Sequence, residues 1–236
     1  MKNLSIYNII KEDKTYKILN GGDEMFIDKS VKDYVVQVQS GEPTPGGGSV
    51  AALAGSLGAA LTSMVGNLTF GKKAYEGLDD KTKTEMEDAF NEVQKSVEKL
   101  NHIVDEDTKA FDGVMEAFKL PKETEEEKKA RTEAIQEGYK KALEVPLECA
   151  EECYRVLELQ NVFAHNGNIN AITDIGVGAL LAATGLEGAI LNVKINLKSI
   201  KDEEYRKSIG EKVDKLLQEG SQLKEELMKI VYTRLG

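Results

Sequence analysis

Apolar residues recur every three or four positions over a long stretch that begins shortly after Asp79. Residues spaced seven apart form one row, and the residues four positions after each of them form a second row. Nine of the ten residues in the two rows are apolar. The two rows are Met86, Val93, Leu100, Asp107 and Val114, and Phe90, Val97, Val104, Phe111 and Phe118. A repeat of about 3.5 residues is typical of a long helix that packs along a seam on a partner helix. The pattern therefore predicts a long helix in the core of the fold.

The rest of the chain also favours helix. It has four prolines and no tryptophan in 236 residues, and Ala, Glu, Lys and Leu are abundant. Such a composition is typical of helical proteins. This length can bury one sizeable core but is short for two domains. We predict an all-α fold, a single-domain antiparallel helical bundle with long helices.

Capping residues and helix breakers set the expected boundaries. A short amphipathic helix is predicted over residues 28–39, with Val31, Tyr34, Val35 and Val38 on its apolar face. A capping box at Thr124 and Glu127 is expected to open a helix that runs to about Leu159, with a kink or break at Pro146. A cap at Thr173 or Asp174 is expected before a helix over 175–200, and a last helix is expected over 202–234.

Residues 1–24 differ from the rest because they show no sustained helical period and are interrupted by Gly21 and Gly22. We interpret them as an amino-terminal appendage and residues 25–236 as the domain. One hypothesis is a mis-assigned start, since residues 21–25 can be encoded by a purine-rich stretch that resembles a bacterial ribosome-binding site ahead of an ATG. Met25 would then be the native first residue.

No charged side chain occurs from residue 43 to residue 71. A membrane helix over 48–68 is one interpretation, but the run is Gly, Ala and Ser rather than Leu, Ile and Phe, which favours a closely packed buried helix. The glycines that open it leave backbone N–H groups accessible to a flat or anionic ligand. A dinucleotide fingerprint does not fit, because no strand precedes the glycines. A P-loop over residues 66–73 does not fit either, because Lys73 replaces the Ser/Thr that binds magnesium and the segment follows a helix. We predict ligand contacts at Pro45, Gly46, Gly47, Gly48 and Ser49.

The charge balance argues against a nucleic-acid surface, because 31 basic residues face 41 acidic ones for a net charge of −10 and no basic arm is present. Cys149 and Cys153 lie one helical turn apart with no histidine at metal-ligand spacing, so we interpret them as packing residues in a reducing compartment. No apolar targeting segment follows a basic start. We expect a cytoplasmic protein with no nucleic-acid or membrane partner.

Asp107 is the exception in the apolar seam. Keeping a lone carboxylate charged among apolar side chains costs on the order of several kcal/mol unless it is paired or hydrogen-bonded, and otherwise its pKa rises. Such a group suits a general acid or base, although a structural Asp satisfied by a cap or a lysine remains the alternative. Asp105 and Glu106 point away from the seam and are expected in solvent, while Asp105 could also line the same opening.

The second Gly/Ala-rich helix also carries candidate ligand contacts. Four residues share one of its faces, at spacings of three and four: Gly185, Gly188, Asn192 and Asn196. Two amides beside two bare glycines suit a ligand with amide-like edges, and close helix packing is the alternative. Lys194, Lys198 and Lys201 form a neighbouring basic row, which is most often a solvated face.

Several blocks of the chain carry a resemblance to a known family. Residues 43–69 read PTPGGGSVAALAGSLGAALTSMVGNLT, which resembles the signature of the formiminotransferase-cyclodeaminase family in its cyclodeaminase half. That half also occurs as stand-alone cyclodeaminases and methenyltetrahydrofolate cyclohydrolases. Three further stretches agree in order: VDEDTKAF, KKALEVPLECAE and GNINAITDIGVGALLAATGLEGAILNVKINLKSIKD. The resemblance extends from about residue 28 to the carboxyl end.

The resemblance implies an all-helical homodimer that acts on a reduced folate, polyglutamylated in the cell, without metal or redox cofactor. It assigns the chemistry to Asp107. The transferase half of the fused enzyme is missing, so another protein is expected to load the formimino group. Cyclodeaminase and cyclohydrolase activities both remain open, with the first favoured, and a non-catalytic helical assembly module is a third hypothesis.

The remaining expected ligand contacts come from the same blocks and from the basic residues near them. Lys72, Lys73, Lys194 and Lys198 are candidates for the glutamate tail of the folate. The polar contacts are Asn170, Asp174, Asn192 and Asn196.

Overall fold

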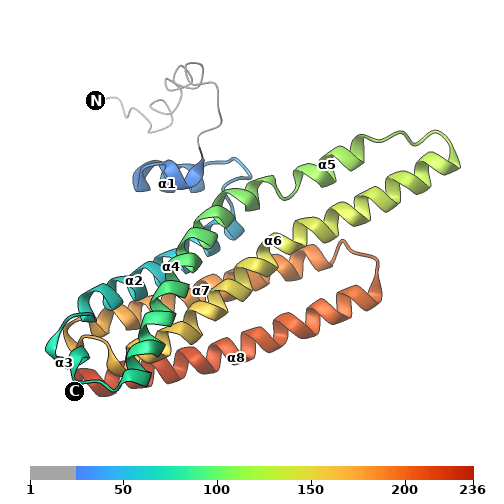
Figure 1. Ribbon diagram of the computed structural model, residues 1–236. Helices are drawn as coiled ribbons and strands as arrows, with labels where there is room; N and C mark the ends of the chain where they lie inside the picture. The colour runs from blue at the N-terminus through green and yellow to red at the C-terminus, as the bar shows by residue number, and fades with distance from the viewer. Residues whose placement is uncertain (1–24) are drawn as a thin grey trace, which may run out of the picture.

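The computed structural model describes residues 25–236, and every regular element in this part of the chain is a helix (Figure 1). The expectations for residues 1–24 lie outside the described residues. The α-helices are α1 (Val31–Val38), α2 (Gly47–Thr69), α3 (Lys73–Glu76), α4 (Asp80–Lys109), α5 (Asp112–Lys119), α6 (Glu125–Asn166), α7 (Ile172–Leu197) and α8 (Glu203–Leu235), and the 3₁₀ turns are η3 (Phe26–Asp28) and η4 (Ile169–Ala171). The prediction of an all-α bundle is confirmed.

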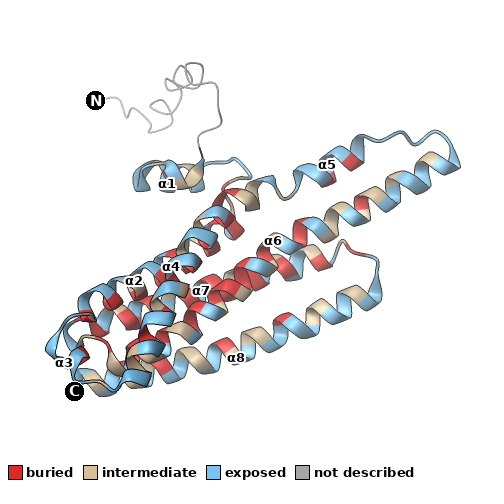
Figure 2. Cartoon of the chain, viewed as in Figure 1, coloured by how far each residue is buried: buried red, intermediate tan, exposed pale blue. Residues whose placement is uncertain are grey.

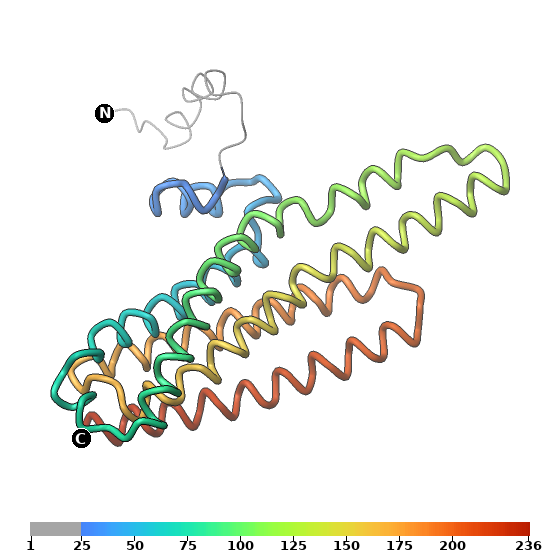
Figure 3. Tube along the Cα trace, in the orientation of Figure 1, coloured from blue at the N-terminus to red at the C-terminus, as the bar shows by residue number. Residues whose placement is uncertain are grey.

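The bundle is built around two antiparallel neighbours, α2 and α7, with α4 and α6 packed on them and α8 on α6 and α7 (Figures 1 and 3). Glycines let the two central backbones touch. A Cβ atom at Gly58 would lie 2.7 Å from the carbonyl oxygen of Gly178, and one at Gly185 would lie 2.8 Å from that of Ala51. Since real Cβ atoms do not come that close to a carbonyl oxygen, the small residues are required by the close approach.

Two segments, Gly47–Thr69 and Ile169–Leu197, are long and apolar enough to cross a membrane by length and composition. Half or more of each is buried inside the protein, and Figure 2 shows the buried residues concentrated on these central helices. This burial is what a core position in the bundle produces.

The predicted seam holds along α4, but beyond it Val114 is buried while the two phenylalanines are not. Met86, Val93, Leu100 and Val104 are fully buried. α4 ends at Lys109, and the next helix, α5, packs against the first half of α6 to form an antiparallel arm (Figure 3). Phe111 and Phe118 are 43% and 44% exposed, because the interruption changes the helix direction and the heptad phase is lost.

Several predicted boundaries were wrong because tertiary contacts override local signals. The capping box at Thr124 is present, but α6 continues through Pro146 to Asn166, since Pro146 is itself buried between buried turns of the helix. α7 begins at Ile172 without a side-chain cap. In α1 the predicted apolar face is not buried: Val31, Val35 and Val38 are exposed, and only Tyr34 is covered.

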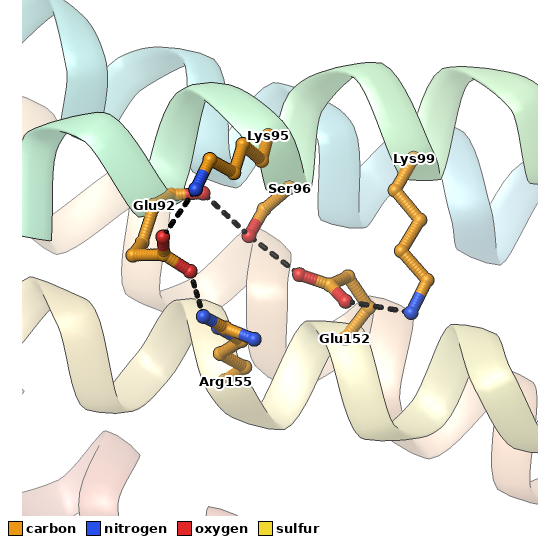
Figure 4. A network of polar contacts seen from close by, with 6 residues as sticks. All are labelled: Glu92, Lys95, Ser96, Lys99, Glu152 and Arg155. Atoms are coloured by element: carbon orange, nitrogen blue, oxygen red, sulfur yellow. Dashed lines mark hydrogen bonds and ion pairs between the residues drawn. The ribbon is translucent and has the colours of Figure 1, made fainter.

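A polar network joins α4 to α6 (Figure 4). The carboxylate of Glu152 is almost fully buried and accepts hydrogen bonds from Ser96 Oγ at 2.5 Å and Lys99 Nζ at 3.0 Å. One turn away, Glu92 pairs with Lys95 and with Arg155. These pairs cross-link the two helices that cover the central pair.

Candidate active site

Asp107 lies in the last turn of α4 and faces the amino terminus of α2. Its Oδ2 accepts a hydrogen bond from the backbone N–H of Ser49 at 3.0 Å. Gly46 caps α2 without any side-chain hydrogen bond, so this helix end presents bare N–H groups, which favour negative charge. The sequence identified Asp107 as a lone acid in an apolar seam, and the structure places it against the amino-terminal turn of α2.

Burial shifts the pKa of the Asp107 carboxyl group. The partly buried position raises the pKa of Asp107 above its ordinary value, and the Ser49 N–H opposes that rise without cancelling it. A carboxyl group with a raised pKa exchanges protons closer to neutral pH than a solvated one. Because the carboxyl group is only partly covered, it can also reach a ligand.

The carboxyl group of Asp107 occupies the space that a side chain at position 48 would take. A methyl group at position 48 would overlap the carboxyl group of Asp107. At Gly47 the nearest atom to such a methyl group is Nδ2 of Asn192, at an ordinary contact distance of 3.6 Å. The glycine run therefore brings the first turn of α2 against α4 on one side and α7 on the other.

A second polar layer lies behind this turn. The buried hydroxyl groups of Tyr34 and Ser49 are 2.9 Å apart. Burial raises the pKa of Tyr34, and the nearby carboxylates of Asp107 and Asp105 add to the rise. Tyr34 was missed as a site residue, although a hydroxyl on the predicted apolar face of residues 28–39 was a signal for it.

Asp105 is buried, so the expectation that it faces solvent was wrong. It is 4% exposed, and its two carboxylate oxygens accept hydrogen bonds from the backbone N–H groups of Phe26 at 2.5 Å and Ile27 at 3.3 Å. The side chain does leave the α4 seam, but η3 covers it there. A contact across 79 residues has no signature in the local sequence.

The predicted site residues fall into two groups at opposite ends of the α2–α7 pair. The first group surrounds Asp107 or follows along α7: Pro45, Gly46, Gly47, Gly48, Ser49, Asn192, Lys194, Asn196 and Lys198. Pro45 is buried, and Asn192 lies beside Gly47 while donating to the carbonyl of Gly188 at 2.9 Å.

The second group lies at the far end: Lys72, Lys73, Asn170 and Asp174. The N–H of Asn168 donates to Thr69 Oγ1 at 2.8 Å, which fixes the start of α7 beside the end of α2. The 23 residues of α2 span about 34 Å, so these four residues cannot touch a small ligand held at Asp107 of the same chain.

A basic pocket of about 450 Å³ lies at the corner between α7 and α8. Its lining residues are Lys194, Leu197, Lys198, Glu203, Arg206 and Lys207. Four cations face one carboxylate, and Lys194 also pairs with Asp214 at 2.7 Å. Arg206 and Lys207 were missed, because only the fold brings α8 against the basic row of α7.

The cysteines are buried free thiols, as expected of packing residues, and the hydrogen bond with Cys149 together with burial raises the pKa of Cys153. Within residues 25–236 no three His, Cys, Asp or Glu side chains gather closely enough to hold a metal ion.

Residues 30–215 match the sequence profile of the family described as formiminotransferase-cyclodeaminase. The chain belongs to this family. It is 38% identical over 208 residues to the methenyltetrahydrofolate cyclohydrolase of Methylorubrum extorquens, covering 88% of this chain and 98% of that one. It is also 38% identical over 200 residues to the formimidoyltransferase-cyclodeaminase of Mus musculus, covering 85% of this chain but 36% of that longer protein.

A solved structure has the same fold. The crystal structure of formiminotetrahydrofolate cyclodeaminase from Thermotoga maritima superimposes with a TM-score of 0.76 at 28% identity, covering 89% of this chain and 98% of that one. The relatives named here are enzymes, and the protein is an enzyme of the same family. The hypothesis of a non-catalytic assembly module is therefore set aside.

Proposed function

We propose that the protein is a one-carbon folate enzyme that converts 5-formiminotetrahydrofolate into 5,10-methenyltetrahydrofolate and ammonia. The observation that carries the proposal is the Asp107 carboxyl group, held partly buried against the bare first turn of α2. It combines a proton-exchanging group with a helix end built from glycines. The similarity to the Thermotoga cyclodeaminase supports the same reaction.

The reaction needs closure of a ring and two proton movements. N10 of the folate attacks the amidine carbon on N5, the C–N bond to the former imino nitrogen breaks, and ammonia leaves. The N10 proton and one further proton end on the leaving nitrogen. Asp107 would take the first or deliver the second, and its anion would stabilise the cationic product. Holding N10 near the carbon contributes on the order of several kcal/mol. The proposed chemistry uses no metal and no redox cofactor.

Methenyltetrahydrofolate cyclohydrolase activity is the second candidate. The match to the Methylorubrum cyclohydrolase over nearly its full length favours it. Here water attacks the methenyl carbon, Asp107 takes one of the two water protons, and the bond between that carbon and N5 breaks as N5 takes the other, which leaves 10-formyltetrahydrofolate. Both reactions use the same pocket and the same carboxyl group.

An ultraviolet assay separates the two. The protein is mixed with 5-formiminotetrahydrofolate and, in parallel, with methenyltetrahydrofolate, and the methenyl absorbance and released ammonia are followed. Appearance of the chromophore with ammonia supports the cyclodeaminase. Its loss from the second substrate without ammonia from the first supports the cyclohydrolase, and no change in either overturns the folate proposal.

The basic pocket at the α7–α8 corner is the proposed site for the glutamate tail. Lys194 lies two residues beyond Asn192 on α7, Lys198 directly follows the end of that helix, and Arg206 and Lys207 extend the cationic lining. A γ-glutamyl chain carries one carboxylate per unit, which matches a row of cations.

We propose a homodimer that forms through the outer face of α2 and α7. Apolar side chains stay exposed along both helices: Val50, Leu57, Met64 and Leu68 on α2, and Val177, Leu180, Leu191 and Ile195 on α7. The α2 half of this face carries no charge, and extended apolar faces of this kind are rare on monomers. A two-fold axis normal to the middle of α2 would place the Lys72 end of one protomer near the Asp107 end of its partner. We expect the dimer in the cytoplasm, without nucleic-acid or membrane partners.

A further inference from the structure

Asp105 ties the start of the described chain to the end of α4. Both of its carboxylate oxygens accept from consecutive backbone N–H groups of η3, and the side chain is 4% exposed. A buried carboxylate satisfied by backbone donors is a strong anchor, because removing either partner leaves a buried group without its hydrogen bond. Asp105 stands two residues before Asp107 on the same helix.

The segment that Asp105 anchors has a second attachment, and this one is at the site. Tyr34, the only buried residue of α1, meets Ser49 through its hydroxyl group, and Ser49 donates its N–H to Asp107. The rings of Phe26 and Tyr34 are in edge-to-face contact with centroids 6.4 Å apart, which joins the two attachments. Apart from Tyr34 and the half-buried Gln37, the residues of α1 are exposed, and the helix is mostly pale blue in Figure 2.

We infer that Asp105 is a positioning residue of the active site, which acts through residues 26–38 to hold Tyr34 over Ser49 and shield the Asp107 carboxyl group from water. This role rests on the proposed function of Asp107. Ser49 contacts both Tyr34 and Asp107, so a loss of the Asp105 anchor loosens the segment that packs on Ser49 beside the carboxyl group.

The role has a measurable consequence at Asp107. Tyr34 of α1 is the titratable group whose pKa responds to the Asp107 carboxylate, while Asp105 on the same helix is turned toward η3 and α2 contributes only backbone N–H groups and Ser49. Since burial is what raises the pKa of Asp107, admitting water lowers that pKa toward its ordinary value.

The test compares Asp105→Asn with Asp88→Asn, an exposed aspartate on the same helix. The Asp107 pKa is measured by carbon-13 NMR titration of the aspartate carboxyl groups, with Asp107→Asn to assign the signal. We expect Asp105→Asn to lower this pKa, to make residues 26–38 more sensitive to trypsin at Lys29 and Lys32, and to reduce kcat by about tenfold or more. Asp88→Asn should leave all three unchanged.

Tyr34→Ala is the second variant, because it removes the side chain that packs on Ser49 and leaves the Asp105 carboxylate unchanged. It should lower the Asp107 pKa in the same direction while η3 stays attached. An unchanged Asp107 pKa in both variants would overturn the inference, even if activity falls. These NMR and proteolysis results do not depend on turnover, so a wild-type protein inactive on both folates would refute the proposed function separately.

Discussion

The carboxyl group of Asp107 and the backbone N–H of Ser49, 58 residues apart in the chain, meet at 3.0 Å. This contact joins the one acid of the α4 seam to the first turn of the charge-free helix. It exists because Gly48 has no side chain. Two sequence features with no evident link therefore form one site.

The contact predicts a strong effect of Gly48→Ala. The added methyl group would overlap the Asp107 carboxyl group and displace it from Ser49, so kcat should fall by about tenfold to a hundredfold. Gly47→Ala should have a smaller effect, since its methyl group meets only ordinary contacts. Steady-state kinetics are the measurement, with Gly210→Ala as the control because nothing lies within 4 Å of a Cβ atom there. Equal kcat values for Gly48→Ala and wild type would contradict this arrangement.

Asp107→Asn should keep or increase stability at neutral pH. Folding raises the pKa of Asp107, so the folded state disfavours the charged carboxylate. The resulting loss of stability is fully present at a pH above the pKa of the folded protein, and it is absent at a pH below the pKa of the unfolded chain. The stability gain of the variant should therefore shrink as the pH falls through that window. Urea unfolding at pH 7 and at pH 4 measures it. If the stability of the variant relative to wild type is instead lower at pH 7 than at pH 4, the folded protein stabilises the charge of Asp107.

The basic pocket predicts a selective loss with long folates. In Arg206→Gln with Lys207→Gln, KM for a triglutamyl substrate should rise several-fold while KM for the monoglutamyl form and kcat change little. Lys215→Gln, an exposed lysine further along α8, is the matched control. If both substrates respond equally, the tail binds elsewhere.

The polar network between α4 and α6 predicts a stability effect without a catalytic one. Glu152→Gln removes the charge that Lys99 and Ser96 share, and should lower the free energy of unfolding by about 1 to 3 kcal/mol. Glu148→Gln is the control, since that carboxylate also contacts Lys99 but is half exposed. Urea midpoints that match for the two variants would show that the burial of Glu152 contributes nothing.

Much of the fold could be predicted because its signals are periodic. The α4 seam from Met86 to Val104 follows directly from apolar spacing, and Asp107 is noticeable only because that spacing is regular. The break before Phe111 could not be predicted, because the heptad continues in sequence while the chain changes direction in space. The helix through Pro146 is similar, since packing on both sides of the proline maintains it against its local preference.

The site was harder to predict than the fold, because its parts meet only through tertiary structure. Asp105 is two residues from Asp107, yet its partners are the N–H groups of Phe26 and Ile27. Lys72 lies just after one block that resembles the family and Asn170 lies within another, but the antiparallel packing of α2 on α7 puts both far from Asp107. Sequence patterns identify which residues are unusual, and the helix packing decides which of them meet.

The most direct measurement is the rate of methenyl chromophore change with wild-type protein and with Asp107→Asn, at matched concentration and with folding verified by circular dichroism. We predict that the wild type turns over a formimino or methenyl folate, and that the variant is folded and slower by about a hundredfold or more. A folded Asp107→Asn protein with wild-type turnover would contradict the central role given to this carboxyl group.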